Sequence, residues 1–196
     1  MSKGRLEAFS DGVIAILITI MVLELRMPDG EATWAALAPI LPKLLTYTLS
    51  FVYLGIYWNN HHHMLQAADR VSGSVLWANL HLLFWLSLVP AVTGWMGEHH
   101  RDSIPAAVYG VVMVMAATAY TILQGRIIAC QGPHSRLRAA VQGDAKGKLS
   151  LLLYVLSIPL AFVNHALSDV IFVGVALIWL VPDRRIEVAL SDQAHS

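Results

Sequence analysis

Apolar residues gather into six long runs along the 196-residue chain, separated by shorter polar links. Each run is close to the ~20 residues that a helix needs to cross a bilayer, although the last is short. The runs lack the two-residue alternation of barrel strands, and isolated strands would leave backbone groups unpaired in lipid. The pattern predicts an all-α integral membrane protein whose six transmembrane helices lie at about 6–27, 40–60, 75–97, 104–125, 148–166 and 169–182.

Prolines and polar links divide the chain further. Pro90 stands inside the third run and predicts a kink or a break there, because proline has no N–H to give to a helix. The link 126–147 is the longest, and its glycine, glutamine and basic residues predict a solvated connection. We interpret residues 1–185 as one six-helix transmembrane domain and residues 186–196 as a polar tail.

The first apolar run has distinct faces when it is drawn as a helix with about 100° per residue. It opens with charged and polar residues and then carries no charge from Val13 to Leu23. Asp11 lies nearly opposite the apolar face and needs donors inside the protein, because an unpaired charge in hydrocarbon is costly. The apolar face can meet lipid, a core, or its own copies around an axis. That face consists of Phe9, Gly12, Ile16, Thr19, Ile20, Leu23 and Met27.

The composition is that of a membrane protein and argues against several other kinds of protein and site. Hydrophobic residues make up 57% of the chain and charged residues 13%, whereas soluble domains carry about a quarter charged residues. The net charge is zero, so the sequence has no nucleic-acid-binding signature. Cys130 is the single cysteine, which excludes an internal disulfide and a thiolate metal site. No small-residue cleavage site follows the first run, so we expect a retained helix and not a signal peptide.

Basic residues are distributed unequally between the two sides of the predicted bundle. Six crossings place both termini on one side, which receives ten Lys and Arg residues against three on the other. The positive-inside rule then predicts cytoplasmic termini in a multi-pass protein of the plasma (inner) membrane. The ten are Lys3, Arg5, Arg70, Arg126, Arg136, Arg138, Lys146, Lys148, Arg184 and Arg185, and the three are Arg26, Lys43 and Arg101.

Polar residues also lie at the predicted cytoplasmic ends of the second and third helices, at the depth of Ser10 and Asp11. Three consecutive histidines, 61–63, suggest a metal site at first sight. Ligands on one helical face stand three or four residues apart, however, and consecutive residues point about 100° apart, so we predict no metal site. A solvated helix end and a hydrogen-bond network both remain open for these histidines. The possible donors to Ser10 and Asp11 are Trp58, Asn60, a histidine of this run and His81.

The residues that open the first helix resemble the signature of the transmembrane protein 175 family of potassium channels. The motif is Arg5-x-x-x-Phe9-Ser10-Asp11 leading into an apolar helix. The resemblance covers nearly the whole chain in helix number and topology, but the specific motif covers only residues 5–23. It implies a pore lined by Ile16, Thr19, Ile20 and Leu23. It also implies a structural polar network that holds the first helix, comprising Arg5, Ser10, Asp11, Trp58, Asn60, His61, Asn79 and His81.

The resemblance implies a homotetramer, because this chain has one copy of the six-helix unit and single-unit members place four first helices around an axis. The expected function is potassium-preferring cation conduction, with K⁺ as the permeant ion, no cofactor, and the lipid bilayer and other copies of the chain as the only partners. Ile16 is β-branched and stiff in a helix, so we expect its ring to be a hydrophobic constriction. A TVGYG-like filter loop is absent, and the glycine cluster at 94–97 lacks that pattern.

Three other functions are weighed against the channel. A proton-coupled transporter is the main alternative, because Asp11, His81 and Glu24 are ionisable groups near the membrane, although no inverted repeat is visible. An auxiliary or scaffold membrane protein is the second. An enzyme is not expected, since G-x-S-x-G and H-E-x-x-H motifs are absent and Ser10 and Asp11, adjacent in one helix, point in different directions.

Overall fold

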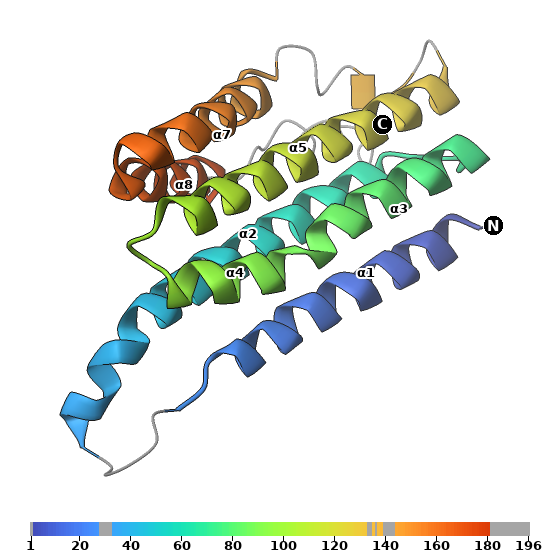
Figure 1. Ribbon diagram of the computed structural model, residues 1–196. Coiled ribbons are helices and arrows are strands. Elements are labelled where there is room, and N and C mark those ends of the chain that lie inside the picture. The colour runs from blue at the N-terminus through green and yellow to red at the C-terminus, as the bar shows by residue number, and fades with distance from the viewer. Residues whose placement is uncertain (1, 28–32, 133–134, 136, 139–143, 181–196) are drawn as a thin grey trace.

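Long helices lie side by side in the structure (Figure 1). A computed structural model describes residues 2–27, 33–132, 135, 137–138 and 144–180, and every regular element within these residues is a helix. The elements are α1 (Lys3–Ile20), η1 (Met21–Glu24), η2 (Trp34–Ile40), α2 (Leu41–Gln66), α3 (Gly73–Ser87), α4 (Val89–Glu98), α5 (Ser103–Gln131), α7 (Ala145–Val163) and α8 (His165–Leu180).

The six predicted apolar runs correspond to six helical units of the structure. Five of these units are long and apolar enough to cross a membrane: α1 with η1, η2 with α2, α3 with α4, α5, and α7. The sixth, α8, is apolar but shorter, with 16 residues. The prediction of an all-helical membrane protein is therefore confirmed for the described part of the chain. The predicted tail, 186–196, lies outside the described residues.

The expectation that the second helix ends near residue 60 is wrong. α2 continues to Gln66, and its last polar side chains find partners inside the protein. His62 and Gln66 bond across one helical turn, with 2.8 Å between their Nε2 atoms, and His61 is 1% exposed. Because these polar side chains have hydrogen-bond partners within the protein, the helix can continue through them.

Pro90 interrupts the third span, as predicted. α3 ends at Ser87 and α4 begins at Val89, so that Pro90 falls in the first turn of α4. Proline fits that position because the first N–H groups of a helix have no partner within it. The span is therefore two helices in sequence, and α4 leans away from the direction of α3 (Figure 1).

α5 occupies the middle of the bundle and packs against α3, α4, α7 and α8. Its contact face is rich in alanine and glycine, which allow helices to approach closely in a membrane. A Cβ atom at Gly110 would stand 2.8 Å from Ser157 Oγ and 3.2 Å from a side-chain carbon of Ile158, both in α7. A glycine at this position is thus required for the observed approach of α5 and α7.

Hydrogen bonds gather the helix ends at the amino-terminal end of the bundle. Lys3 Nζ donates to the Gln66 carbonyl at 3.1 Å, which joins the start of α1 to the end of α2. The Gln131 side chain donates to the Arg70 carbonyl at 3.0 Å, which joins the end of α5 to the link before α3. The opposite end carries an ion pair of 2.9 Å between Lys43 and Glu98. Lys3 and Arg70 therefore lie at one end of the bundle, and Lys43 lies at the other.

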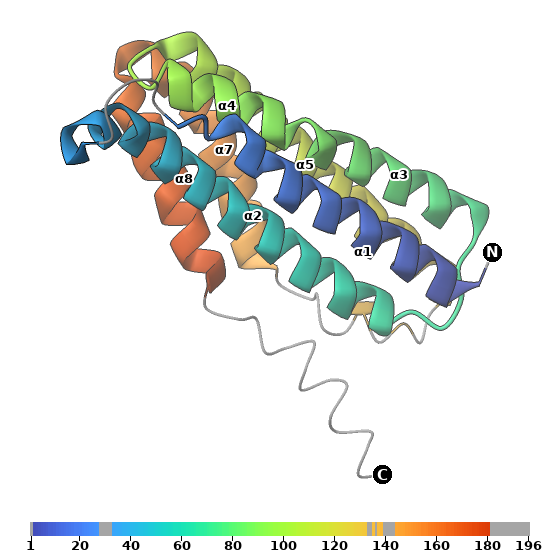
Figure 2. The same ribbon diagram turned by 90° about the horizontal axis from the view of Figure 1, so that it is seen from below.

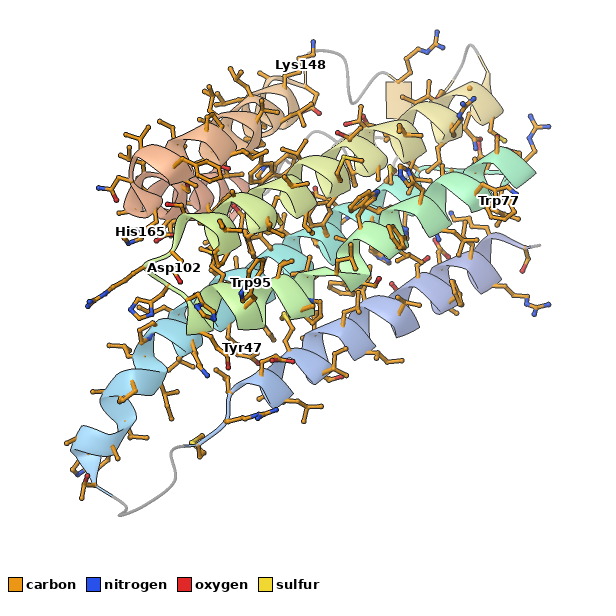
Figure 3. All side chains as sticks on the ribbon, viewed as in Figure 1. Tyr47, Trp77, Trp95, Asp102, Lys148 and His165 are labelled. Atoms are coloured by element: carbon orange, nitrogen blue, oxygen red, sulfur yellow. The ribbon has the colours of Figure 1, made fainter. Side chains whose placement is uncertain are left out.

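Tryptophans lie toward both ends of the bundle. Trp77, near the start of α3, is 75% exposed, and Trp95, near the end of α4, is 39% exposed. Figure 3 shows these two side chains toward opposite ends of the molecule, with Asp102 and His165 beyond Trp95. Exposed tryptophans at two levels are typical of the two membrane–water interfaces.

Candidate functional site

α1 lies on the outside of the bundle, beside α2 and α3 (Figure 1, Figure 2). It attaches to them through a single stripe of side chains that are 0–6% exposed. The members stand three or four residues apart, which is the spacing of one helical face. They are Leu6, Ser10, Ile14, Leu17 and Met21.

A second face of α1 is uncovered in the single chain. All seven residues of the predicted apolar face are exposed, including Ile16 at 59% and Ile20 at 40% in α1 and Leu23 at 72% in η1. Met27 lies beyond the end of η1. These side chains therefore do not pack against α2 and α3 of their own chain. A continuous row of exposed apolar side chains on one helix marks a surface for lipid or for another protein chain.

The carboxyl end of this face has a geometry that the sequence did not predict. The α-helix ends at Ile20, and residues Met21–Glu24 form a 3₁₀ turn, η1. Residues three apart in a 3₁₀ turn are aligned along the axis. Leu23 is therefore closer to the line of Ile20 than a continuous α-helix would place it, which extends the row of apolar side chains.

A fully buried chain of hydrogen bonds holds the amino-terminal half of α1. Asn79 of α3 donates from Nδ2 to Ser10 Oγ at 2.9 Å, and its Oδ1 lies 2.7 Å from Nε2 of His61 in α2. Ser10 donates in turn to the Leu6 carbonyl at 2.9 Å. Ser10 and Asn79 are 0% exposed and His61 is 1% exposed, so three helices meet at one polar contact without access to water.

The direction of each bond in this chain follows from the number of protons available. Ser10 has one hydroxyl proton, and the Leu6 carbonyl accepts it, so Ser10 Oγ must accept from Asn79. The amide nitrogen of Asn79 therefore faces Ser10 and its carbonyl oxygen faces His61. A carbonyl oxygen only accepts, so Nε2 of His61 carries a proton and donates it.

Asp11 is bonded separately, at the edge of this contact. Trp58 of α2 donates from Nε1 to Asp11 Oδ1 at 2.9 Å, and the Trp58 ring stacks on the His62 ring with centroids 6.1 Å apart. Asp11 is half-buried and Trp58 is 43% exposed. The carboxylate thus has a donor in the neighbouring helix, but it is not sealed from solvent in the single chain.

Two residues of the predicted network bond elsewhere. Asn60 donates to the Ile56 carbonyl at 2.9 Å, and His81 accepts from Trp85 Nε1 at 3.0 Å. Each partner stands four residues away on the same helix, within reach on the same face. The expectation that Asn60 and His81 donate to Ser10 and Asp11 is therefore wrong. Arg5 is exposed at the start of α1.

The ionisable groups of the transporter alternative are not assembled into one site. Glu24 lies against Gly94 of α4, 13 residues beyond Asp11, which is about 20 Å of helix. His81 is engaged with Trp85. Among the described residues, no three His, Cys, Asp or Glu side chains are grouped as a possible metal site.

The structure contains a cavity beside α2, α5, α7 and α8 that no sequence pattern predicts. It is lined mainly by aromatic side chains and by one carboxylate. These are Tyr53 and Tyr57 of α2, Tyr120 of α5, Tyr154 of α7, Trp179 of α8, and Asp144 at the start of α7. The only signal in the sequence is the pair Tyr53 and Tyr57, which share one face of a helix. The other members come from segments that are distant in the chain.

Comparisons with known proteins match the whole described bundle. Residues 5–90 match the family model described as "Endosomal/lysosomal potassium channel TMEM175". A protein of Chryseobacterium sp. (strain P1-3), named as a potassium channel, is 54% identical over 192 residues, which cover 98% of this chain and 100% of that protein.

A crystal structure of a lysosomal potassium-selective channel TMEM175 homolog from Chamaesiphon minutus has a similar fold. The TM-score is 0.82 at 25% sequence identity, and the match covers 92% of this chain and 97% of that chain. The human protein named "Endosomal/lysosomal proton channel TMEM175" is 28% identical over 136 residues, which are 62% of this chain and 27% of that protein.

Proposed function

The chain belongs to the TMEM175 family, and from that premise we propose that it forms a homotetrameric, potassium-preferring cation channel. Four α1 helices surround the conducting path, and the uncovered face of each one turns toward the axis. The path is lined by Ile16, Thr19, Ile20 and Leu23, without a TVGYG loop. The protein is a channel and not an enzyme, and both of its termini are cytoplasmic in the plasma membrane.

The observation that supports this proposal most is the exposed apolar row on α1. A bundle that has buried Ile14 and Leu17 on the packing face of the same helix leaves Ile16, at 59% exposure, uncovered. One helix cannot enclose an ion path, but four symmetry-related copies bring equivalent side chains together in rings. The choice of potassium as the permeant ion is supported by relatives named as potassium channels, one of which is 54% identical to this chain.

Thr19 is oriented to contribute to ion selectivity. Its hydroxyl donates to the Ile16 carbonyl at 2.9 Å, so the proton is directed along the helix and the oxygen lone pairs face outward. In a tetramer, four such oxygens form a ring that can replace part of the water shell of a partly hydrated cation. The neighbouring isoleucine rings offer no such replacement, so selectivity is assigned to Thr19.

The first prediction is passive flux. Purified protein in liposomes should carry potassium down its gradient with equal proton concentrations on both sides, because a channel needs no coupling ion. Potassium-loaded vesicles with a potassium-sensitive dye measure this flux, and sodium-loaded vesicles measure the preference. An Ile14→Asn preparation, which should lack a folded bundle, is the negative control for leak.

The same vesicles separate the two competing functions. Potassium flux that occurs only against an opposing proton gradient would favour the proton-coupled transporter and reject the channel. Rapid acidification without potassium movement would instead assign this chain a proton channel activity, as the name of the human relative states for that protein. A flux of neither ion from correctly folded protein would contradict both proposals.

The second prediction concerns assembly. The purified protein should have a mass of about four chains after correction for bound detergent, because the exposed face of α1 is covered only by other copies. Multi-angle light scattering with refractive-index and absorbance detection measures the protein mass alone. A Trp77→Ala variant, altered at an exposed site of α3, should keep the same mass. A monomer at all concentrations would contradict the proposal.

A further inference from the structure

The aromatic-lined cavity has a chemical character that the channel proposal does not use. Its volume is about 60 Å³, and a water molecule needs roughly 10–15 Å³ by this measure. The space is therefore equivalent to about four to six waters, which is room for a small substituted ammonium group. The cavity faces the amino-terminal end of the bundle, where Asp144 begins α7.

The walls present the faces and edges of several aromatic rings. Tyr57 of α2 and Tyr120 of α5 meet edge to face, with centroids 6.2 Å apart. Tyr53 of α2 and Tyr154 of α7 lie 6.1 Å apart, and Trp179 closes the side toward α8. The negative faces of aromatic rings attract cations, and cages of such rings are a known means of binding quaternary ammonium groups.

Three polar side chains of the walls already donate hydrogen bonds within the protein. Trp179 Nε1 donates to Ser150 Oγ at 2.8 Å, and Ser150 donates to the Lys146 carbonyl at 2.8 Å. Asn60 donates to the Ile56 carbonyl at 2.9 Å. These groups still offer oxygen lone pairs and aromatic ring faces. Both suit a positively charged ligand better than a ligand that must accept hydrogen bonds.

One carboxylate stands among the described lining residues, and no Lys or Arg side chain does. Asp144 caps α7 by accepting from the Gly147 N–H at 2.9 Å. A Cβ atom at Gly147 would collide with this carboxylate, so the glycine is what allows the close approach. The cap holds the negative charge in the wall of the aromatic cavity.

An apolar groove along α2 and α8 adjoins the cavity. It has a volume of about 270 Å³ and shares Ile56, Asn60 and Trp179 with the cavity. Phe51, Val52 and Leu180 form its apolar part. A hydrocarbon chain attached to an ammonium group in the cavity would therefore have an apolar surface to lie on.

We propose that this cavity and groove bind an alkylammonium ligand, with the ammonium group between the tyrosine rings and Asp144 and the alkyl chain in the groove. The ligand is either the head and chain of an aminophospholipid of the bilayer or a free amphiphilic amine. The two sources share the chemistry that the site recognises. Neither source depends on the proposed ion conduction.

The test uses octyltrimethylammonium as the probe and octanol as its uncharged counterpart, with binding measured from the ligand-induced rise in unfolding temperature. The full-length protein should bind the ammonium probe and bind octanol much more weakly. Asp144→Asn keeps the helix cap, since Asn is an equally good cap, but removes the charge. It should weaken binding of the probe about tenfold or more.

Matched variants separate charge and ring effects from loss of structure. Asp102→Asn removes an exposed carboxylate before α5, at the opposite end of the bundle, and should leave binding unchanged. Tyr57→Phe keeps the ring and should bind normally, whereas Tyr57→Leu should weaken binding about three- to thirtyfold. This pair still decides the question if Asp144→Asn fails to fold.

Equal binding of octanol and the ammonium probe, or unchanged binding in both Asp144→Asn and Tyr57→Leu, would overturn the proposal. The source is identified by native mass spectrometry of protein reconstituted with equal amounts of phosphatidylethanolamine and phosphatidylglycerol. Selective retention of phosphatidylethanolamine that Asp144→Asn abolishes assigns the site to a lipid. Binding of the free probe without that retention assigns it to a soluble amine.

Discussion

An Ile16→Asn variant is expected to conduct more current than the parent and to discriminate less between potassium and sodium. In the proposed tetramer, the Ile16 side chains form a ring that offers an ion no substitute for its water shell and that can empty of water. Asparagine keeps a similar size but holds water in the ring. A barrier lower by about 1.4 kcal/mol would raise conductance about tenfold. Single-channel recording in planar bilayers measures both quantities.

The position of Ile16 makes this substitution tolerable for folding. Its side chain is 59% exposed in the single chain, whereas Ile14, two residues earlier, is 0% exposed. Ile14→Asn is therefore the matched control, since it makes the same chemical change on the packing face of the same helix. It should destabilise the bundle by about 2–5 kcal/mol and leave little assembled protein.

Two outcomes would contradict the assignment of Ile16. An assembled Ile16→Asn oligomer with the conductance and selectivity of the parent would remove Ile16 from the path. Loss of assembly as severe as in Ile14→Asn would mean that the exposed face of α1 packs against protein in the oligomer and does not line water. Thr19→Val, altered one turn away, should change selectivity and leave assembly intact.

The division of α1 into faces could be predicted from the sequence because helical periodicity is a local property. The positions 9, 16, 20 and 23 share a face in any α-helix, and the structure leaves that face uncovered. Which stripe packs on the bundle was not evident, because Ile14 and Ile16 have the same chemistry. Burial depends on the neighbours that α2 and α3 supply, and these are set by the whole fold.

The polar partners could be predicted only in part for the same reason. The predicted network includes Asn79 and His61, and in the structure Asn79 bonds to both Ser10 and His61. Asn60 has the same side chain as Asn79 at a similar depth, but its amide bonds to its own backbone. The rotation of each helix about its axis determines whether such an amide bonds to a neighbouring helix or to its own backbone. No pattern within a single segment specifies that rotation.

The aromatic cavity is the clearest case of a site beyond the reach of sequence patterns. Tyr57, Tyr120 and Trp179 come from α2, α5 and α8, and each looks like an ordinary aromatic residue of a membrane helix. The cavity lies where α2, α5, α7 and α8 meet. Only the three-dimensional structure shows that Asp144, whose side chain caps α7, also lines this space.

An Asn79→Leu variant is expected to lower the stability of the bundle more than any other conservative change near Asp11. It removes the oxygen that accepts from His61 and the amide that donates to Ser10, in a contact that is closed to water. A buried donor left without a partner costs about 1–3 kcal/mol, and each kcal/mol lowers the unfolding temperature of a chain of this size by about 2–4 °C. Thermal unfolding in detergent measures the change.

Two neighbouring variants calibrate this effect. Asn59→Leu makes the same substitution at an exposed position of α2 and should change stability by less than about 0.5 kcal/mol. Asp11→Ala breaks the bond from Trp58 but removes the charge together with its carboxylate, so no buried charge is left unpaired. It should impair assembly of α1 without altering ion preference, and it should cost less than Asn79→Leu.

The double variant Asn79→Leu, His61→Leu decides whether the hydrogen bonds or the shape of the contact is responsible. In the single variant, the Nε2–H of His61 has lost its acceptor and remains buried. Replacing His61 as well removes that orphaned donor, and apolar groups in place of both partners can be nearly neutral. The double variant should therefore be more stable than Asn79→Leu alone. Additive losses would mean that the two side chains hold α1 by packing, and that the hydrogen-bonded chain from His61 to Ser10 contributes little.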